Sequence, residues 1–384
     1  MLHKASIGSW AIAIVFAFGC MGCGSSGRVE KKTENGVEIV FNHVEPYRLA
    51  GKPARLSLKK EYSIDFGSEE IGAFGIANAI DFEIDAAGRP YFYDSNAKAD
   101  TIFAFDEQGR FRRSFGRKGQ GPGEINWILF AQFDAAGRLV VTDHMNHKVL
   151  TFEDSGHCLL ETRFPSGDRI LYPLANGNYL CLRRHKLDKS PMPEDVFSLL
   201  DSSFNEIGIL DRRTPYDINS LGYRGVVSQP VFQFIVAADS IFIVNEDRGY
   251  EILNYDLAGN LVRKIRKEAV PVEISDAVKK DRAKTFEGMG EKAWFPKNWP
   301  PISTFFSDEQ GYLYVKTFEA GGNPGESRFD VFDADGAYFS KISLRVFAPG
   351  DRFAAVRFRN GKLYAFEEKP DGYREFCVYR MIWE

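Results

Sequence analysis

Two aspartates and two histidines in similar segments of the sequence have side chains that suit metal binding or proton transfer. Asp143 is followed directly by His144 and then by His147, and Asp94 stands at the equivalent position of an earlier, similar segment. Carboxylate and imidazole side chains bind metals and carry protons. A loop, however, does not hold two histidines three residues apart on one side as a helix does. We therefore predict no metal site and keep His144 and His147 as candidate ligand contacts. We interpret Asp94 and Asp143 as caps of the loops that follow them, and they are candidate ligand contacts as well.

The segment GRKGQGPGE at 116–124 carries the cations Arg117 and Lys118 among four glycines. Glycine-rich loops cradle phosphate when a strand precedes them and a helix begins directly after them. Here the pattern predicts a strand on both sides, so the helix N-terminus that would attract an anion is missing. We interpret the segment as a tight structural crossover and keep the two cations as candidate contacts for an anionic ligand.

The composition of the chain limits the functions in which these residues can take part. The chain is 44% hydrophobic and 27% charged, with a net charge of -4. It has no block rich in lysine and arginine, so the electrostatic footprint of a nucleic-acid binder is absent and we expect no nucleic-acid partner. The sequence also lacks the G-x-S-x-G and H-E-x-x-H motifs of hydrolases. We predict no catalytic residue, and we favour a protein that is not an enzyme.

The first 27 residues predict export. Lys4 precedes a short apolar segment at 10–19, which is too short to span a bilayer as a helix and is typical of a secretory signal. The small residues just before Cys20 resemble the lipobox of bacterial lipoproteins, and Cys23 is the alternative lipidated cysteine. The resemblance implies lipid anchoring in the cell envelope of a bacterium, at the outer membrane or on the periplasmic side. An ordinary cleaved signal is the other interpretation.

Cysteine usage in the rest of the chain does not suggest a disulfide scaffold. Cys158, Cys181 and Cys377 are widely separated and odd in number, and each lies in an apolar stretch. Buried free thiols are the expectation, and one disulfide pair is possible.

Two stretches of the sequence repeat the same order of elements. Residues 82–115 and 131–164 each read as apolar strand, Asp-Ala-Ala-Gly turn, apolar strand, polar loop, strand, glycine turn and strand. Four strands that recur at about 49 residues are typical of a propeller blade. Weaker copies follow at 170–210, 234–265, 304–342 and 353–384, and the last copy has only three strands. The strand-like segment 55–67 supplies the missing one and closes the ring.

The predicted fold is therefore all-β: a six-bladed β-propeller of four-stranded antiparallel blades that forms one domain over residues 28–384. The match of one repeat to NHL-type repeats rests on Asp134, Gly137, Asp143, Asn146, Lys148, Val149 and Phe152. Together with the GRKGQGPGE joint, it makes residues 36–384 similar to the six-bladed β-propeller lipoproteins of bacteria. That resemblance implies the fold and says little about function.

The order of strands in each blade places short turns and long loops on opposite faces of the propeller. Connections from the first to the second strand and from the third to the fourth strand of a blade lie on one face, which we call the short-turn face. All the long connections that we identify lie on the other face, the long-loop face: 66–78, 116–127, 185–195, 211–230, 266–302 and 319–327. Long loops in compact domains are usually functional. We therefore predict that the long-loop face binds the ligand, with Arg183 as a further candidate contact.

The longest of these connections, 266–302, predicts a helical insertion at 275–294 that begins at Ser275. An extended aromatic stretch follows. The insertion either covers the channel mouth as a lid that carries Trp294 and Trp299, or plugs the mouth with its aromatic residues packed beneath it.

Two functions follow as hypotheses. The first is an exported, lipid-anchored binding or scaffold module that holds a peptide, glycan or protein on its long-loop face without a cofactor. The alternative is a metal-dependent hydrolase or lactonase with its site at the channel mouth. Calcium-dependent lactonases on six-bladed propellers resemble this chain in architecture only, and calcium is the cofactor this alternative implies. A cluster of channel carboxylates would favour the alternative; an open aromatic mouth would favour the first.

Overall fold

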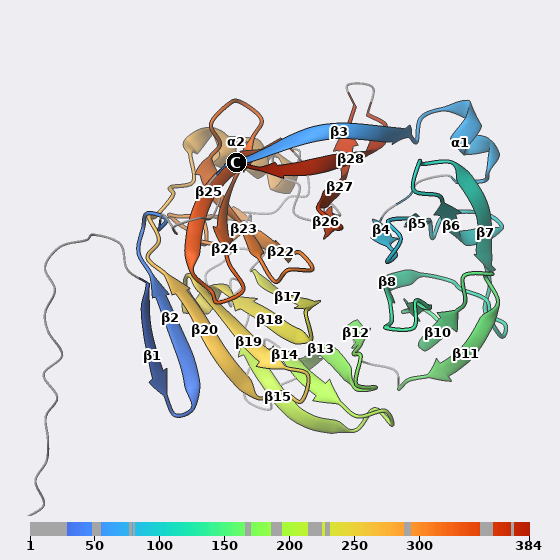
Figure 1. Ribbon diagram of the computed structural model, residues 1–384, viewed down its shortest axis with the longest axis horizontal. Coiled ribbons are helices and arrows are strands. Elements are labelled where there is room, and N and C mark those ends of the chain that lie inside the picture. The colour runs from blue at the N-terminus through green and yellow to red at the C-terminus, as the bar shows by residue number, and fades with distance from the viewer. Residues whose placement is uncertain are drawn as a thin grey trace, which may run out of the picture.

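The computed structural model describes residues 29–47, 55–76, 79, 81–165, 170–185, 194–213, 225–226, 231–287, 293–345, 356–369 and 372–384. Six sheets stand around a central channel, with β4, β8, β12, β17, β22 and β26 innermost (Figure 1). The predicted six-bladed propeller is confirmed. Cys20, Cys23 and the rest of the predicted leader lie outside the described residues.

The first three blades follow the chain in order, each from its innermost strand outward. Blade 1 consists of β4 (Asp81–Ile84), β5 (Pro90–Tyr93), β6 (Asp100–Phe105) and β7 (Phe111–Arg117). Blade 2 consists of β8 (Ile128–Phe133), β9 (Leu139–Asp143), β10 (Lys148–Phe152) and β11 (Cys158–Arg163). Blade 3 consists of β12 (Ile170–Pro173), β13 (Tyr179–His185), β14 (Glu194–Leu200) and β15 (Glu206–Arg213).

Blades 4 and 5 keep this order, and blade 6 takes its outer strand from the beginning of the chain. Blade 4 consists of β17 (Phe232–Ala237), β18 (Ser240–Asn245), β19 (Glu251–Asp256) and β20 (Leu261–Lys267). Blade 5 consists of β22 (Thr304–Ser307), β23 (Leu313–Ala320), β24 (Ser327–Phe332) and β25 (Tyr338–Leu344). Blade 6 consists of β26 (Val356–Arg359), β27 (Lys362–Glu368), β28 (Arg374–Trp383) and β3 (Leu56–Asp65).

Ring closure by an N-terminal strand is confirmed. β3 pairs antiparallel with β28 from Asp65 opposite Glu375 to Leu56 opposite Trp383. Beyond the strands, the Arg55 and Glu384 backbones exchange two hydrogen bonds of 3.1 and 2.9 Å. Blade 6 thus has its fourth strand, and the pairing ties the two ends of the propeller sequence together.

A hairpin that the predicted blades do not include extends blade 4. Asn35 and Gly36, at φ of 50° and 81°, join β1 (Glu30–Glu34) to β2 (Val37–Asn42), and β2 pairs parallel with β20. The blade 4 sheet therefore has six strands. An Asn-Gly pair between two strands is a strong hairpin signal, because both residues accept the positive φ that the tight turn needs.

The repeated Asp-x-x-Gly motif forms the turns of the short-turn face. In the turn that begins at Asp134, the carboxylate accepts hydrogen bonds from the Ala136 and Arg138 N–H groups at 2.9 Å each. Gly137 has a φ of 74°, which a residue with a side chain rarely adopts. The same pattern of bonds to the second and fourth following residues recurs at Asp85, Asp106, Asp201, Asp256, Asp308 and Asp333.

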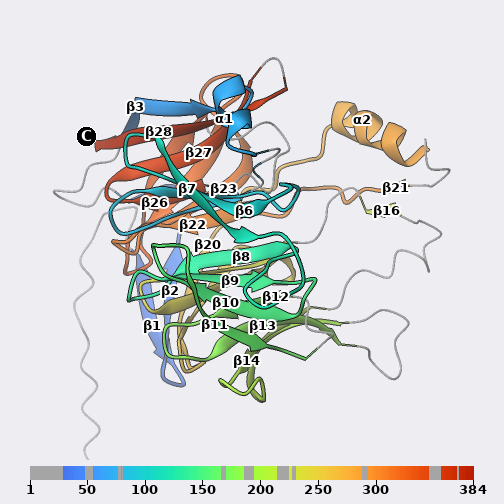
Figure 2. The ribbon, with the colours of Figure 1, turned by 90° about the vertical axis from the view of Figure 1, so that its right-hand side faces the viewer.

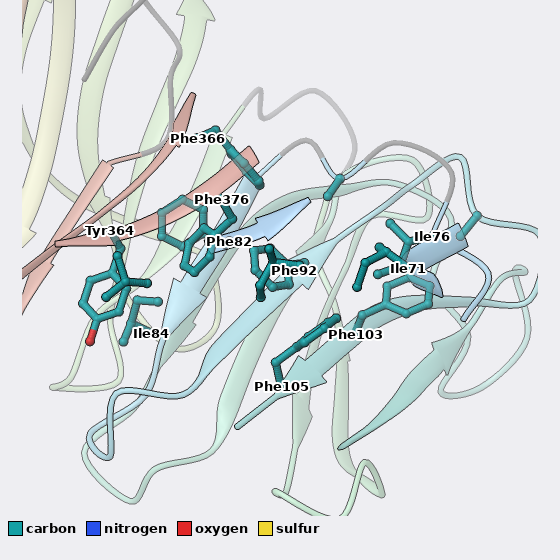
Figure 3. Close-up of a cluster of buried hydrophobic side chains, with 14 residues drawn as sticks. Ile71, Ile76, Phe82, Ile84, Phe92, Phe103, Phe105, Tyr364, Phe366 and Phe376 are labelled. Carbon is teal, nitrogen blue, oxygen red and sulfur yellow. The ribbon is translucent and has the colours of Figure 1, made fainter. Parts of the chain in front are cut away.

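The core lies between blades rather than within them. Among the described residues, each pair of neighbouring blades shares one cluster of buried apolar side chains. Between blades 6 and 1, the rings of Phe82, Phe92, Phe366 and Phe376 meet at centroid distances of 4.8 to 6.2 Å (Figure 3). Sheets covered on both faces need unbroken apolar strands, which explains the high phenylalanine content.

Helices are short and lie outside the blades. α1 (Glu69–Ala73) lies in the connection from β3 to β4, and the 3-10 helix η1 (Glu246–Arg248) follows β18. The predicted insertion helix is α2 (Asp276–Glu287), and the Ser275 hydroxyl accepts a hydrogen bond from Val278 N–H at 3.3 Å. α2 lies behind the outer part of blade 5 and stands clear of the ring (Figures 1 and 2), so the helix itself does not plug the channel. Neither described α-helix is long and apolar enough to cross a bilayer.

Candidate functional site

In GRKGQGPGE, the two cations that we predicted as ligand contacts bind groups of the protein itself. The segment joins β7 to β8, as the crossover interpretation requires. The Lys118 ammonium donates to the carbonyl oxygen atoms of Ser95, at 2.6 Å, and Asn126. Arg117, which is 76% exposed, donates to Glu124, whose carboxylate also accepts from Gly121 N–H at 2.9 Å. Lys118 therefore holds the crossover in place through these two carbonyl groups. Much of the Arg117 side chain is exposed to solvent.

Asp94 and Asp143 both cap the loops that follow them. The fully buried Asp143 carboxylate accepts hydrogen bonds from Asn126 N–H at 2.7 Å, Trp127 N–H at 3.0 Å and the Asn146 side-chain amide at 2.7 Å. Asp94 is also fully buried and accepts from Asn96 N–H at 2.8 Å. Neither carboxylate reaches the solvent, so these bonds hold the loops of the long-loop face in place.

His144 and His147 do come close together, with ring centroids 6.2 Å apart. His147 has a φ of 50°, and its Nδ1 is buried without a hydrogen-bond partner. Across the described ranges, no group of three potential metal ligands contains either histidine. The pair therefore lacks the third and fourth ligands that a zinc site requires.

One group of three potential ligands does occur in the described part of the chain, and it does not suit a metal. It consists of Glu367, Glu375 and Cys377 in blade 6. Lys60 binds the Glu375 carboxylate at 2.9 Å, and the Tyr379 hydroxyl donates to Glu367. Burial raises the pKa of the Cys377 thiol to about 12, so the thiolate form that binds metals is disfavoured. No disulfide bond joins any of the three described cysteines, Cys158, Cys181 and Cys377.

Among the described residues, the innermost strands bring together an ionic group and an aromatic group. On β26, Arg357 pairs with Glu83 at 2.6 Å and with Asp81 at 3.3 Å, both on β4. Burial raises the pKa of Glu83 despite the guanidinium beside it. The rings of Phe130, Tyr172 and Phe234, one from each of three inner strands, lie with centroids 5.4 to 5.9 Å apart.

These channel residues do not fit a calcium site. Calcium takes six to eight oxygen ligands. The two carboxylates of this group both bind the Arg357 guanidinium, with which an incoming cation would have to compete. The described channel residues therefore do not form the carboxylate cluster that the lactonase alternative needs.

A pocket with aromatic walls opens on the long-loop face between blades 4 and 5. Its cavity volume is about 340 Å³. Four separate segments line it: residues 249–250 just before β19, the two arms of the 266–302 connection, and residues 317–319 near the end of β23. The Trp299 and Phe318 rings stack in parallel with centroids 4.5 Å apart. The other lining residues that we discuss are Tyr250, Lys267, Asn298, Thr317 and Glu319, and Pro271, Pro300 and Pro301 complete the wall.

The backbone fixes Trp299 at this wall. Trp299 N–H donates to the Val272 carbonyl oxygen at 2.9 Å, and Ile274 N–H donates to that of Lys297 at 3.1 Å. The two arms of the insertion are thereby joined below α2. Trp299 thus belongs to a pocket wall rather than to a lid over the channel. The remaining lid residue, Trp294, lies in β21 (Ala293–Trp294), which pairs with β16 (Gly225–Val226), and its side chain is outside the described part.

Arg183 lies on β13 and is paired with Glu206 of β15 in the same blade. Its side chain is 31% exposed, and its Nε is buried without a hydrogen-bond partner. The predicted candidates therefore do not converge on one site. Asp94, Lys118, Asp143 and Arg183 act within or between blades, while Trp299 alone of the predicted set lines the pocket.

Large exposed apolar side chains in the loops gather on the long-loop face. Among the described residues, Trp127 (41% exposed), Met145 (60%), Val270 (55%) and Tyr373 (56%) are on connections of this face. The other exposed large apolar residues lie on the strands β11, β15 and β20, which are the fourth strands of their blades. The described short turns carry none, so the two faces differ in chemistry as well as in loop length.

Comparisons with known proteins agree with the fold. The model of the DUF5128 family, described as a 6-bladed beta-propeller, matches residues 83–221. A search of curated protein sequences finds no significant match. A crystal structure of a protein provisionally described as exported, from Bacteroides fragilis, is similar at a TM-score of 0.53 and 15% identity, covering 90% of this chain and 99% of that one.

Two further structures are similar. A member of the DUF4221 family from Bacteroides vulgatus has a TM-score of 0.53 at 10% identity, with 87% of this chain and 100% of that one covered. Virginiamycin B lyase from Staphylococcus aureus has a TM-score of 0.43 at 9% identity, with 85% and 100% covered. The observed strand order and the family model define the class of protein: the chain is a six-bladed β-propeller.

Proposed function

We propose that this propeller is a non-catalytic binding module that holds its ligand on the long-loop face, in the pocket bounded by Trp299 and Phe318. The pocket itself is the observation that supports the proposal. Small-molecule and peptide sites are concave and mostly apolar, with a few polar groups that fix orientation. This pocket combines stacked rings and three prolines with the polar side chains of Lys267, Thr317 and Glu319. The ligand classes that we propose are a peptide, a glycan or a partner protein.

The proposal places the protein in a bacterial cell envelope. Its support is the apolar segment before Cys20, the small residues ahead of that cysteine, and the NHL-like repeat at 134–152. We propose that residues 1–27 comprise a signal peptide and a tether, and that a lipid on Cys20, or on Cys23, holds the propeller at the outer membrane or on the periplasmic side. The propeller would then meet its ligand outside the cytoplasm.

Ligand screening by thermal shift tests the proposal. A ligand that binds only the folded state raises Tm, and the stabilisation increases with the logarithm of the ratio of ligand concentration to Kd. We expect a hit from glycan or peptide panels to lose its effect in Trp299→Ala and to keep it in Trp127→Ala, a matched change at an exposed tryptophan on the same face. Loss of binding in the Trp127 variant alone would move the site away from the pocket.

The hydrolase alternative has its own test on the same sample. Metal analysis together with melting in EDTA and in calcium would reveal a bound cation. A near-stoichiometric metal whose removal lowers Tm would contradict the proposal. The carboxylates of the channel would then be the residues to substitute.

A further inference from the structure

A buried ammonium group adjoins the pocket. Lys267 lines the cavity, yet its side chain is only 2% exposed. Its Nζ lies 3.4 Å from the Asp330 carboxylate and donates to the Glu268 carbonyl oxygen at 3.2 Å. The rings of Tyr250 and Tyr338 flank it, with centroids 5.1 and 4.8 Å away. Lysine is almost never buried to this extent unless it is paired, so the cation is part of a built site.

The Lys267 ammonium has more hydrogen-bond donors than it has oxygen partners among the described residues. A lysine ammonium has three N–H donors, and Lys267 has two oxygen partners among the described residues. The carboxylates around the pocket each have at least one partner, although Oδ1 of Asp330 is buried and accepts no hydrogen bond from the described residues. The fully buried Asp330 also accepts from the Tyr250 hydroxyl at 2.7 Å, and Glu319 is bound by Lys341 at 2.9 Å. One donor of Lys267 therefore remains for a group that enters the pocket.

We propose that the pocket binds a ligand with a flat apolar ring and an acidic group, a carboxylate or a sulfonate, attached beside it. The ring would pack against the wall formed by Trp299 and Phe318, and the acidic group would accept a hydrogen bond from Lys267. Charge-assisted hydrogen bonds are the strong ones, and exclusion of water strengthens them further. This inference rests on the proposed function, because it names the ligand class of the same pocket.

Two fluorescent probes with one aromatic skeleton test the charge requirement. 8-Anilino-1-naphthalenesulfonate carries the acidic group, and N-phenyl-1-naphthylamine lacks it. We expect the folded full chain to bind the sulfonate saturably and more tightly than the neutral probe. Trp299→Ala should weaken both probes. Lys267→Met should remove about tenfold of the affinity for the sulfonate and leave the neutral probe unchanged.

Matched variants separate recognition from folding. Lys148→Met changes an equally buried lysine in blade 2, which also binds one carbonyl oxygen and one carboxylate. Lys267→Met leaves Asp330 buried without its cation, so the double variant with Asp330→Asn is made beside it. Melting curves and circular dichroism identify the variants that fold. The preference for the sulfonate should be lost in both Lys267 variants and kept in the Lys148 variant.

Each outcome decides between the two proposals. Equal binding of both probes, with loss of both in Trp299→Ala, would overturn the acidic-ligand inference and support the pocket. Saturable binding that Trp299→Ala does not change would show an adventitious site and overturn the inference. Failure of both probes to bind would count against the inference and against the pocket as the functional site.

Discussion

At the scale of single residues, carboxylates hold neighbouring blades together. Asp154, in the last turn of blade 2, accepts a hydrogen bond from the Tyr91 hydroxyl at 2.6 Å and ion pairs with Arg89, Arg112 and Arg113 of blade 1. Although burial opposes the charged form, the arginines and the tyrosine together lower the pKa of Asp154 below its usual range. One side chain thus neutralises part of a cluster of three cations.

The depressed pKa gives a pH-dependent prediction for Asp154→Asn. A carboxylate whose pKa is lowered by folding stabilises the protein above its unfolded pKa, and this stabilisation is lost as pH falls. We expect the variant to have a lower Tm than the wild type at pH 7. The difference should shrink as pH falls below about 4, because the carboxylate of the unfolded chain then takes up a proton while that of the folded protein stays ionised. Melting curves from pH 7 to pH 2 measure the difference, and a constant difference would contradict the assignment.

At the scale of elements, the crossover 116–124 depends on Gly116 for two reasons. Gly116 has a φ of 72°, and a Cβ at this position would lie 2.8 Å from Ile125 Cδ1. Gly137 has a similar φ of 74° but has open space around the same position. The two glycines therefore separate backbone strain from steric clash.

We predict that Gly137→Ala costs about 1 kcal/mol, from the left-handed backbone alone. Gly116→Ala should cost about 1–3 kcal/mol more, because the added methyl group must displace buried side chains. Urea unfolding measures both values. Equal costs at the two positions would show that the crossover tolerates the methyl group.

The hairpin β1–β2 is tied to two blades through Asn42. The fully buried Asn42 amide donates to the carbonyl oxygen atoms of Arg266 and Gly336, each at 3.0 Å, and its oxygen accepts from Tyr338 N–H at 2.8 Å. These bonds bridge blade 4 and blade 5, so the hairpin contributes to the ring as well as covering an edge strand.

We therefore predict that Asn42→Ala lowers the free energy of unfolding by about 2–4 kcal/mol, because three buried hydrogen bonds are lost and their partners stay unpaired. Asn176→Ala is the control: this exposed asparagine also links two blades, through a bond to the Leu257 carbonyl oxygen at 2.8 Å, and should cost under about 1 kcal/mol. A small effect at Asn42 would mean that the hairpin detaches easily.

The elements that the sequence predicts well are those set by local chemistry. The Asp-x-x-Gly turns and the Ser275 helix start each involve residues within a few positions of one another. The hairpin had an equally local signal in Asn35-Gly36, and it lies outside the repeat, so the repeat analysis does not reach it. The Trp299 pocket could not be predicted, since Tyr250, Trp299 and Phe318 meet only when blades 4 and 5 pack together.

The same limit applies to the candidate polar residues. Lys118 and Asp143 have the types expected at a ligand site, but both bind groups of the protein: Lys118 donates to the carbonyl oxygen atoms of Ser95 and Asn126, and Asp143 accepts from Trp127 N–H among others. Sequence alone does not show whether a loop cation faces solvent or a carbonyl group, because the fold brings the loops together. Lys267 gave no signal for a related reason: its carboxylate partner Asp330 is on the next blade.

At the scale of the whole molecule, the proposed lipid anchor would determine where the propeller works. If Cys20 is lipidated, eight residues separate it from Val29, where the described chain begins. A fully extended tether of that length spans about 30 Å. The propeller would therefore stay close to the membrane surface.

We predict that Cys20→Ala abolishes incorporation of labelled fatty acid and moves the protein from the detergent phase to the aqueous phase on Triton X-114 partition. Cys23→Ala is the matched control and should leave both properties unchanged. The reverse pattern would assign the lipid to Cys23. Retention of the label in both variants would contradict lipidation at either cysteine.

The pairing of β3 with β28 also has a consequence for how the protein is made. The two strands are more than 300 residues apart in the chain, and pairing must bridge that separation. Synthesis delivers β28 after the strands of the first five blades, so those blades can form while the sixth still lacks β28. Contacts between such distant segments form slowly, because the entropy of closing the long loop is lost before the contacts stabilise the fold. The open edge of β3 is then exposed until β28 has been made, and this is the interval in which the nascent chain most needs protection from aggregation.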